Sequence, residues 1–340
     1  MKVSLVKDKN GIEYYAIPHL RDLQLLMLDL LQTVDKIARE NDIPYWIDGG
    51  TLLGAIRHNG FIPWDDDVDI CLMKEDYDRL LPLLDEYTKD KDDLSLMYYK
   101  NEKYQHWSDI LTSDRIRIEY NGMQRLTRMD IFPMKLVKNE VSEIEEDKYI
   151  TDLLNWFSKG KTKYFPKIKE TYKFDNLKDA LKEKKKFFES FHNLHLKKNS
   201  EIVNKTDLLV DYSFGNNYIS GERDYKNYSD IFPLKEIEFE GYRFLCPKNI
   251  DKYLNVLYGD YLKLPSLKNR KQLHNSKINV ENSSISEEEL EILLAEQNEY
   301  FYYANKMSYK FYYLFRQIKS NGIINAYTEI IKPFLKRKLR

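Results

Sequence analysis

The sequence is poor in cysteine and carries almost no net charge. Its 340 residues include only two cysteines, Cys71 and Cys246, which form neither a disulfide framework nor a metal-ligand spacing. We interpret Cys71 as a small buried side chain in a core strand. The 54 lysines and arginines nearly balance the 55 aspartates and glutamates, so the formal net charge is −1. No overall positive field therefore indicates a nucleic-acid partner.

Long hydrophobic runs are also absent. The first residues, MKVSLVKDKNG, lack the apolar centre of a signal peptide, and no run of about 18 uncharged apolar residues occurs. We therefore expect no transmembrane helix and a cytoplasmic protein, with any membrane contact peripheral and at the inner face of the cell membrane. The hydrophobic content of 42% is enough for a core in one large domain or two ordinary ones.

The most informative stretch is residues 45–73, with the sequence YWIDGGTLLGAIRHNGFIPWDDDVDICLM. Apolar residues alternate with others along residues 68–73, which predicts a strand followed by a charged helix. Side chains two residues apart share a face of a strand, so we expect Asp67 and Asp69 to point the same way. The core side of this strand is then formed by Val68, Ile70 and Leu72.

Two further aspartates, Asp65 and Asp66, crowd the same place. Like charges this close repel, and buried carboxylates are costly without a cationic partner, so the cluster either faces water or holds a cation. Two carboxylates about 7 Å apart on one strand face can converge on a divalent ion, and their hard oxygens suit Mg²⁺ or Mn²⁺. A calcium loop fits less well, because its sixth and twelfth positions hold Ile70 and Asp76 instead of glycine and glutamate.

A double glycine precedes the aspartates. Gly49 and Gly50 follow a predicted strand over residues 45–48, and Thr51 opens a predicted helix over residues 52–57. Glycines let the backbone approach a phosphate, and a helix N-terminus favours an anion. The pattern therefore predicts that the Gly-Gly-Thr turn binds phosphate.

Metal carboxylates on a strand after such a turn form the phosphate-handling arrangement of the nucleotidyltransferase fold. The motif GGTLLGAIRHNGFIPWDDDVDI closely resembles the core motif of the LicD family, which includes bacterial phosphocholine transferases and the animal fukutin-related ribitol-phosphate transferases. The resemblance runs over residues 20–274 and is patchier at RMDIFP, FEGYRFLCP and LYGDYLKLP. It implies an α+β fold, a nucleotidyltransferase-like mixed β-sheet flanked by helices. The zinc-binding cysteine cluster of the animal enzyme is missing, so no zinc is implied.

The resemblance also implies the metal ligands. The family aspartates that match Asp67 and Asp69 bind the metal, and the fold places a third carboxylate on a neighbouring strand. Our candidate is Asp130, near the end of a strand predicted over residues 124–132; it would complete the metal site or take the acceptor's proton, and the alternative is a cap of the turn before Pro133. Asp230, in the similar segment SDIFPLK, is a rival candidate, but the residues that precede it are polar and do not resemble a core strand.

The implied reaction is transfer of a phosphoalcohol, with phosphocholine first, from a CDP-linked donor to a hydroxyl of a cell-surface glycan, teichoic acid, capsule or lipopolysaccharide precursor, releasing CMP. Gly50 and Thr51 would donate N–H groups to phosphate. Arg57 and His58 can neutralise developing charge; the alternatives are a salt bridge of Arg57 to the acidic cluster, and capping or packing by His58. Asp130 would accept the acceptor's proton.

The alcohol is open, and so is the exact acceptor. CDP-choline, CDP-ribitol and CDP-glycerol are the candidate donors, and a glycan or lipid-linked glycan is the acceptor. Choline favours an aromatic cage around its quaternary ammonium, whereas ribitol or glycerol favours hydrogen bonds. Four aromatic residues are candidate cage walls: Tyr45, Trp46, Trp64 and Trp107.

We divide the chain into a catalytic core (residues 1–138), a charged helical insert (139–205), a continuation of the catalytic domain (206–282) and a helical C-terminal extension (283–340). The basic amphipathic tail at residues 323–340 can rest on an anionic membrane, form a dimer contact or pack on the domain. Local patterns predict further elements: a hairpin over 3–7 and 12–17, helices over 21–41, 75–84 and 250–257, and a strand pair over 237–239 and 242–245.

Two other function classes remain open. One is nucleotidyl transfer, in which a nucleoside monophosphate moves from an NTP to a small hydroxyl compound and pyrophosphate is released. The other is a non-catalytic membrane-docking module. The presence of both Asp67 and Asp69 with the Gly-Gly turn favours an enzyme.

Overall fold

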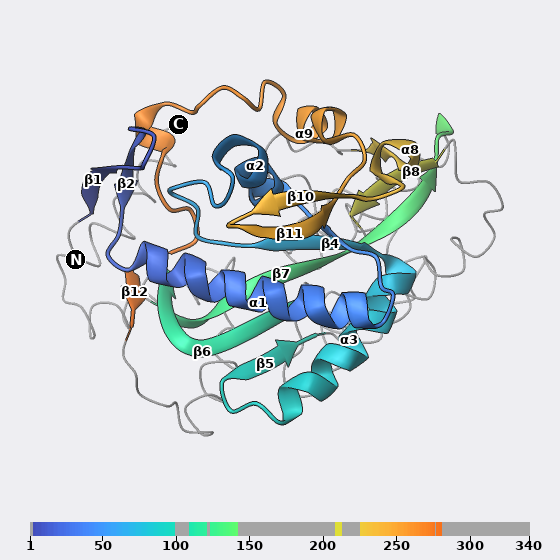
Figure 1. The fold of residues 1–340 in the computed structure, drawn as a ribbon, viewed down its shortest axis with the longest axis horizontal. Coiled ribbons are helices and arrows are strands. Elements are labelled where there is room, and N and C mark those ends of the chain that lie inside the picture. The colour runs from blue at the N-terminus through green and yellow to red at the C-terminus, as the bar shows by residue number, and fades with distance from the viewer. Residues whose placement is uncertain are drawn as a thin grey trace, which may run out of the picture.

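The computed structural model describes residues 3–98, 109–120, 123–141, 208–212, 225–275 and 277–280. Within these residues an eight-stranded mixed sheet has the order β12-β6-β7-β4-β3, with β5 paired to β6, β8 paired to β7, and β9 paired to β8 (Figure 1). Its strands are β3 (Trp46–Ile47), β4 (Asp69–Met73), β5 (Leu94–Met97), β6 (Asp109–Tyr120), β7 (Met123–Lys138), β8 (Leu208–Tyr212), β9 (Lys226–Asn227) and β12 (Lys277–Asn279). The predicted mixed sheet is thus confirmed.

Helices flank this sheet, as predicted. The long helix α1 (Leu20–Glu40) lies across the front of the sheet in Figure 1 and packs on β6 and β7. Its apolar residues recur at helical spacing, and those facing the sheet are buried. The other helices are α2 (Gly49–His58), α3 (Lys74–Lys89), the short α8 (Tyr228–Ile231), α9 (Ile250–Tyr258) and a 3₁₀ turn, η1 (Leu267–Asn269).

The centre of the sheet is the parallel pair β4 and β7. Its register places Asp69 opposite Asp130 and Leu72 opposite Pro133. We predicted that the second strand ends near Asp130, but β7 continues through Pro133 to Lys138 and pairs there with β8. Asp130 is therefore a mid-strand residue, and its predicted alternative role as a turn cap is wrong.

Two small antiparallel hairpins stand outside the main sheet, and both were predicted. In the first, β1 (Ser4–Lys7) pairs with β2 (Glu13–Ala16); in the second, β10 (Lys235–Phe239) pairs with β11 (Tyr242–Cys246). The predicted helix over residues 75–84 is longer than expected, because α3 continues past Pro82 to Lys89.

Several predictions lie outside the described residues. These are the helical insert from residue 142 onward, the C-terminal extension at 283–340 with its basic tail, and Trp107. Among the helices that the structure describes, none is long and apolar enough to span a bilayer.

The position of α2 against the following loop depends on a glycine. A Cβ at Gly54 would lie 2.4 Å from the carbonyl oxygen of Gly60 and 3.0 Å from the backbone nitrogen of Ile62. Both are backbone atoms, so neither can move aside without shifting the chain. The close approach brings the loop that carries the aspartates onto α2.

We therefore predict that Gly54→Ala lowers the free energy of unfolding by about 1–3 kcal/mol, although alanine is the better helix former. Chemical denaturation measures this. Lys36→Ala, at an exposed position of α1, is the control and should change stability by less than about 0.5 kcal/mol. An alanine variant as stable as the parent protein would contradict the close packing.

Candidate active site

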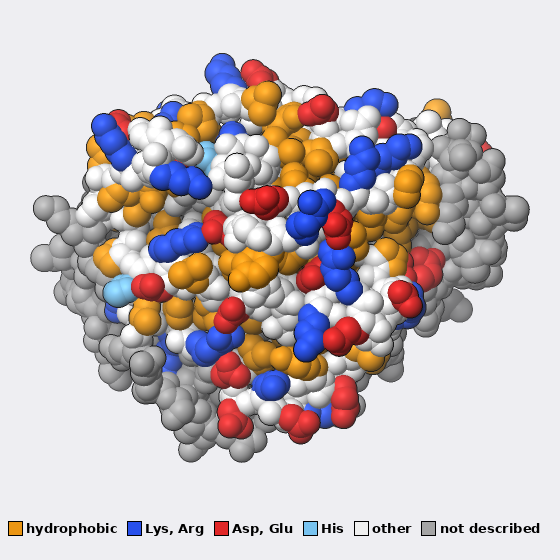
Figure 2. Space-filling model, viewed as in Figure 1, with side chains coloured by type: hydrophobic (Ala, Val, Ile, Leu, Met, Phe, Trp, Pro, Cys, Tyr) orange, Lys and Arg blue, Asp and Glu red, His pale blue; other side chains and the backbone are white. Residues whose placement is uncertain are grey.

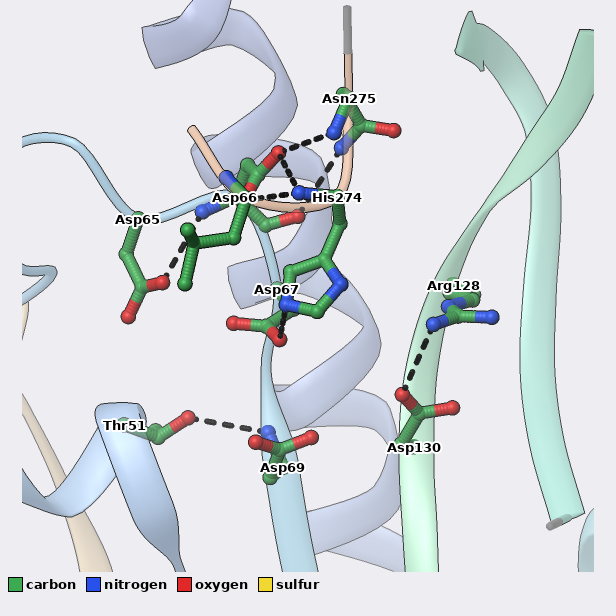
Figure 3. Close-up of polar contacts among 10 residues, drawn as sticks. Thr51, Asp65, Asp66, Asp67, Asp69, Arg128, Asp130, His274 and Asn275 are labelled. Atoms are coloured by element: carbon green, nitrogen blue, oxygen red, sulfur yellow. Dashed lines mark hydrogen bonds and ion pairs between the residues drawn. The ribbon is translucent and has the colours of Figure 1, made fainter. Parts of the chain in front are cut away.

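Asp69 is held by three elements at the start of β4. Its backbone N–H donates to Thr51 Oγ1 of α2 at 3.0 Å, and its carbonyl accepts from the Asp48 N–H at 3.1 Å. On the other side, the Asp130 N–H donates to the Val68 carbonyl at 3.0 Å, which continues the parallel pairing of β4 with β7. Figure 3 shows the Asp69 side chain between Thr51 and Asp130. Residues from α2, β4 and β7 therefore converge where β4 begins.

Asp67 lies outside the strand, which corrects our prediction that Asp67 and Asp69 share one strand face. β4 begins only at Asp69. The Asp67 carboxylate faces the loop after η1, where its Oδ2 lies 2.8 Å from Nε2 of His274 (Figure 3). The core residues of this segment are as predicted, since Val68, Ile70 and Leu72 are fully buried.

Asp69 is surrounded by other carboxylates. Burial and neighbouring carboxylates raise the pKa of Asp69 well above its usual range. Four neighbours contribute: Asp67, Asp130, Asp48 and Asp65. The pKa of Asp65 is raised in the same way, by burial and then by Asp67 and Asp66.

This clustering fits a divalent cation, because a cation would relieve the repulsion and carboxylate oxygens are the ligands that Mg²⁺ and Mn²⁺ prefer. The described side chains do not, however, form a group of three or more His, Cys, Asp or Glu residues at metal-binding separation. Asp67 is turned towards His274, and Asp130 Oδ2 lies 3.5 Å from Nη2 of Arg128. The metal site at Asp67, Asp69 and Asp130 stays a prediction.

Asp67 and His274 form an ion pair. Burial alone would raise the pKa of Asp67, but the charge and hydrogen bond of His274 outweigh it and lower the value to about 2. In turn, Asp67 raises the pKa of His274 to about 9, against the opposing effect of burial. Both partners are therefore charged at neutral pH.

Asp66 has a structural role. Its buried carboxylate accepts backbone N–H groups from Leu273, His274 and Asn275, the shortest being 2.7 Å from Asn275. Burial raises the pKa of Asp66 to about 6 despite the His274 charge. Asp66 thus holds the loop in the position where His274 contacts Asp67.

The double glycine forms the first turn of α2, whereas we predicted a turn before the helix. Gly49 has a φ of +52°, and the helix begins there after its N-cap residue, Asp48. A Cβ at Gly50 would lie 2.6 Å from Asp65 Oδ2, and one at Gly49 would lie 3.2 Å from Asp69 Oδ2. Carboxylates therefore lie against this helix N-terminus, where an anion is favoured.

Arg57 and His58 contact each other. Arg57 Nε donates to His58 Nε2 at 3.0 Å, and its guanidinium lies 5.9 Å from the Trp64 ring centroid. Among the described residues Arg57 makes no salt bridge, so the predicted alternative of a salt bridge to the acidic cluster is not formed. Burial and then Arg57 lower the pKa of His58 to about 4. A neutral ring at pH 7 agrees with the packing alternative, and the role of His58 in neutralising charge stays a prediction.

The candidate cage walls that the structure describes are buried. Tyr45 and Trp46 are fully buried core residues, so they cannot form a cage for choline. Trp64 is also buried, with arginines over its ring. The carboxylate of Asp230 contacts Asn227, Asn249 and Lys252 around α8 and α9, while its rival Asp130 lies opposite Asp69.

Three residues near the cluster were missed by sequence reasoning. His274 is the last residue of a basic segment, residues 268–274. No local pattern shows where this segment lies relative to the aspartates. Arg128 is two residues before Asp130, so their side chains share a face of β7, a spacing that could have indicated it. The hydroxyl oxygen of Tyr258 lies 3.6 Å from a Cβ built at Gly49, and burial followed by the surrounding aspartates raises the pKa of this tyrosine well above its usual range.

A mixed sheet with carboxylates on neighbouring strands beside a glycine-initiated helix defines a nucleotidyltransferase-like domain. Residues 42–174 match the family model described as LicD/FKTN/FKRP, nucleotidyltransferase domain. These residues therefore match the LicD family, and the predicted resemblance to LicD-type transferases is confirmed.

Named relatives agree with this family. The chain is 28% identical over 268 residues to the lipopolysaccharide cholinephosphotransferase LicD of Haemophilus influenzae, which covers 75% of this chain and 96% of that protein. It is 32% identical over 91 residues to the ribitol 5-phosphate transferase FKRP of Homo sapiens, covering 27% of this chain and 17% of FKRP. The ribitol-5-phosphate transferase FKTN of Mus musculus is 33% identical over 79 residues, 17% of its length. The likeness to the animal proteins is thus confined to a small part of each.

The role of Asp66 can be tested by hydrogen exchange. We predict that Asp66→Ala makes the amides of Leu273, His274 and Asn275 exchange at least about tenfold faster, because hydrogen bonds to a charged acceptor contribute about 1.5–3 kcal/mol each. Asp22→Ala, at an exposed aspartate of α1, is the control. Unchanged exchange at all three amides would show that the loop is held by other contacts.

His58 predicts a pH dependence of stability. Its pKa is about 4 in the folded chain and 6.5 without the fold, so the unfolded chain binds a proton that the folded chain does not. This contribution is fully present above pH 6.5 and is lost as the pH falls towards 4, on the order of 3 kcal/mol. His58→Gln should lessen that fall in the free energy of unfolding, whereas His19→Gln, on the surface, should not. Equal slopes for His58→Gln and the parent protein would contradict the buried neutral ring.

Proposed function

We propose that the chain transfers a phosphoalcohol, phosphocholine first, from a CDP-linked donor to a hydroxyl of a cell-surface glycan precursor and releases CMP. The carboxylate cluster around Asp69, beside the N-terminus of α2, carries this proposal. The names of the relatives support its coarser part, phosphoalcohol transfer to glycans. The acceptor we favour is a lipid-linked precursor reached from the cytoplasmic side.

The chain's own residues would position both substrates. N–H groups of Gly50 and Thr51, at the start of α2, would donate to phosphate oxygens of the donor. Thr51 also holds Asp69 through its side chain. Asp67, Asp69 and Asp130 would hold Mg²⁺ or Mn²⁺, which when bound supplies positive charge to the pyrophosphate and the leaving CMP.

The reaction is a single displacement at phosphorus. The acceptor oxygen bonds to the phosphorus that carries the alcohol, the bond from that phosphorus to CMP breaks, and CMP leaves with the electron pair. Asp130 would take the proton of the acceptor hydroxyl. Positioning and charge neutralisation supply most of the rate in such transfers, which fits a site built of carboxylates and helix N–H groups.

A second candidate is nucleotidyl transfer, which the nucleotidyltransferase-like fold favours. In that case the acceptor attacks the phosphorus next to the nucleoside of an NTP, and pyrophosphate is released. The two reactions differ in the leaving group, so one assay separates them.

The test measures CMP release from CDP-choline, CDP-ribitol and CDP-glycerol with Mg²⁺ or Mn²⁺ and a crude surface-glycan acceptor. We predict CMP from one donor, lost with EDTA and reduced at least about 100-fold in Asp69→Asn. Asp230→Asn is the matched control, an aspartate outside the cluster, and should keep the parent rate.

Each contrary result has a distinct meaning. Pyrophosphate from an NTP, without CMP from any donor, would replace phosphoalcohol transfer by nucleotidyl transfer. Full activity of Asp69→Asn would reject the site in either reaction. If the protein binds a CDP-linked ligand without turnover in any mixture, the non-catalytic module becomes the better account.

A further inference from the structure

The β1–β2 hairpin carries apolar side chains on both of its faces. On the inner face Tyr14 lies 6.2 Å from Trp64, ring centroid to centroid, and packs with Ile12 and Ala16 against the core. Residues directly opposite in an antiparallel pair share a face, and Leu5 is opposite Tyr15. The outer face therefore carries Leu5 and Tyr15 together with Val3. An outward face of this kind is usually polar, yet Val3 is 50% and Leu5 51% exposed.

The loop after η1 extends the outer face. Its backbone runs beside β2, because the Tyr15 N–H donates to the Arg270 carbonyl at 2.8 Å and the Gln272 amide donates to the Tyr15 carbonyl at 2.9 Å. The Arg270 guanidinium turns inward over Trp64, and Gln272 Oε1 accepts the Ile17 N–H. Lys271 lies between these two inward residues, and Leu273 follows them. Both are exposed, and the exposed fraction of Leu273 is 69%.

We name this surface the hairpin face. Figure 2 shows hydrophobic and basic side chains next to one another over the hairpin. The hairpin face consists of Val3, Leu5, Lys7, Lys9, Lys271 and Leu273.

The lysines of the hairpin face outnumber the acids beside them. Lys7, Lys9 and Lys271 stand against Glu13, which pairs with Lys7 at 3.4 Å, and Asp8, which accepts the N–H groups of Asn10 and Ile12, so the net charge is positive. Lys9 and Lys271 are exposed. Exposed aliphatic side chains framed by lysines match an anionic bilayer, where lysines meet lipid phosphates and short apolar side chains enter the interface. A protein partner fits less well, because lysine is depleted in protein–protein interfaces.

The hairpin face is joined to the active site through the loop. Leu273 directly precedes His274, which pairs with Asp67, and the same backbone is fastened by the Asp66 carboxylate. A surface that binds the hairpin face therefore lies beside the reacting groups.

We propose that the hairpin face docks the protein on an anionic lipid bilayer and so presents the active site to an acceptor anchored there. This extends the proposed function, which supplies the reason for docking. Binding to lipid is measured without donor, acceptor or turnover, so it can fail or succeed independently of the proposed reaction.

The experiment is co-sedimentation of the full chain with vesicles of phosphatidylcholine, alone or mixed with phosphatidylglycerol. We expect binding to the mixed vesicles only, weakening as salt is added. Lys9→Glu with Lys271→Glu, and separately Leu5→Ser with Leu273→Ser, should each lower the partition coefficient about tenfold or more.

Matched controls change the same chemistry elsewhere. Lys36→Glu with Lys89→Glu alters charge equally on α1 and α3, and Tyr242→Ser with Val256→Ser removes exposed apolar groups on β11 and α9. Both pairs should bind as the parent does. Equal melting temperatures would show that the hairpin variants are folded.

Three results would overturn the proposal. They are no binding of the parent protein to anionic vesicles, undiminished binding of folded hairpin variants, and a parent dimer that Leu5→Ser with Leu273→Ser dissociates without any lipid binding. The last result would assign the hairpin face to a second copy of the chain, and light scattering after size exclusion detects it.

Discussion

The repulsion among the carboxylates around Asp69 is the constraint on which the site depends. Bringing Asp69 opposite Asp130, with Asp65 and Asp67 close by, costs free energy that the protein must offset elsewhere. Part of the offset is visible: His274 pairs with Asp67, Arg128 lies beside Asp130, and helix α2 points its N-terminus at Asp65 and Asp69. A bound divalent cation and a donor phosphate would complete this balance.

Three adjacent aspartates do three different things. Asp65 lies against Gly50 at the start of α2, Asp66 accepts backbone N–H groups from a remote loop, and Asp67 forms an ion pair with His274. Asp66 and Asp67 contact the same loop in different ways, since Asp66 accepts the backbone N–H of His274 and Asp67 pairs with its ring. One short acidic run thus contacts both the start of α2 and the loop after η1, next to the first residue of β4.

The loop after η1 joins surface to site. Arg270 and Gln272 fasten it to β2, Asp66 fastens it beside β4, and His274 stands between these attachments and Asp67. Hydrogen bonds hold the loop at both ends, so the position of His274 is fixed relative to the hairpin.

The sequence by itself determined the elements that depend on local periodicity and turns. It predicted α1, the β1–β2 and β10–β11 hairpins and α9, because the residues that encode them are neighbours along the chain. It also indicated the family and the carboxylates Asp67 and Asp69, because their motif is local, whereas Asp130 was predicted from the resemblance.

The tertiary structure decided what distant segments bring together. β7 continues through Pro133 because β4 pairs with residues 130–134 and β8 pairs with residues 134–138. Tyr45 and Trp46 lie in the core because packing removes them from water. His58 is neutral because burial and the charge of Arg57 both lower its pKa. Asp67 meets His274 because Asp66 and the contacts of Arg270 and Gln272 with β2 hold the loop in place. Desolvation and ion pairing depend on three-dimensional neighbours, and no local pattern records them.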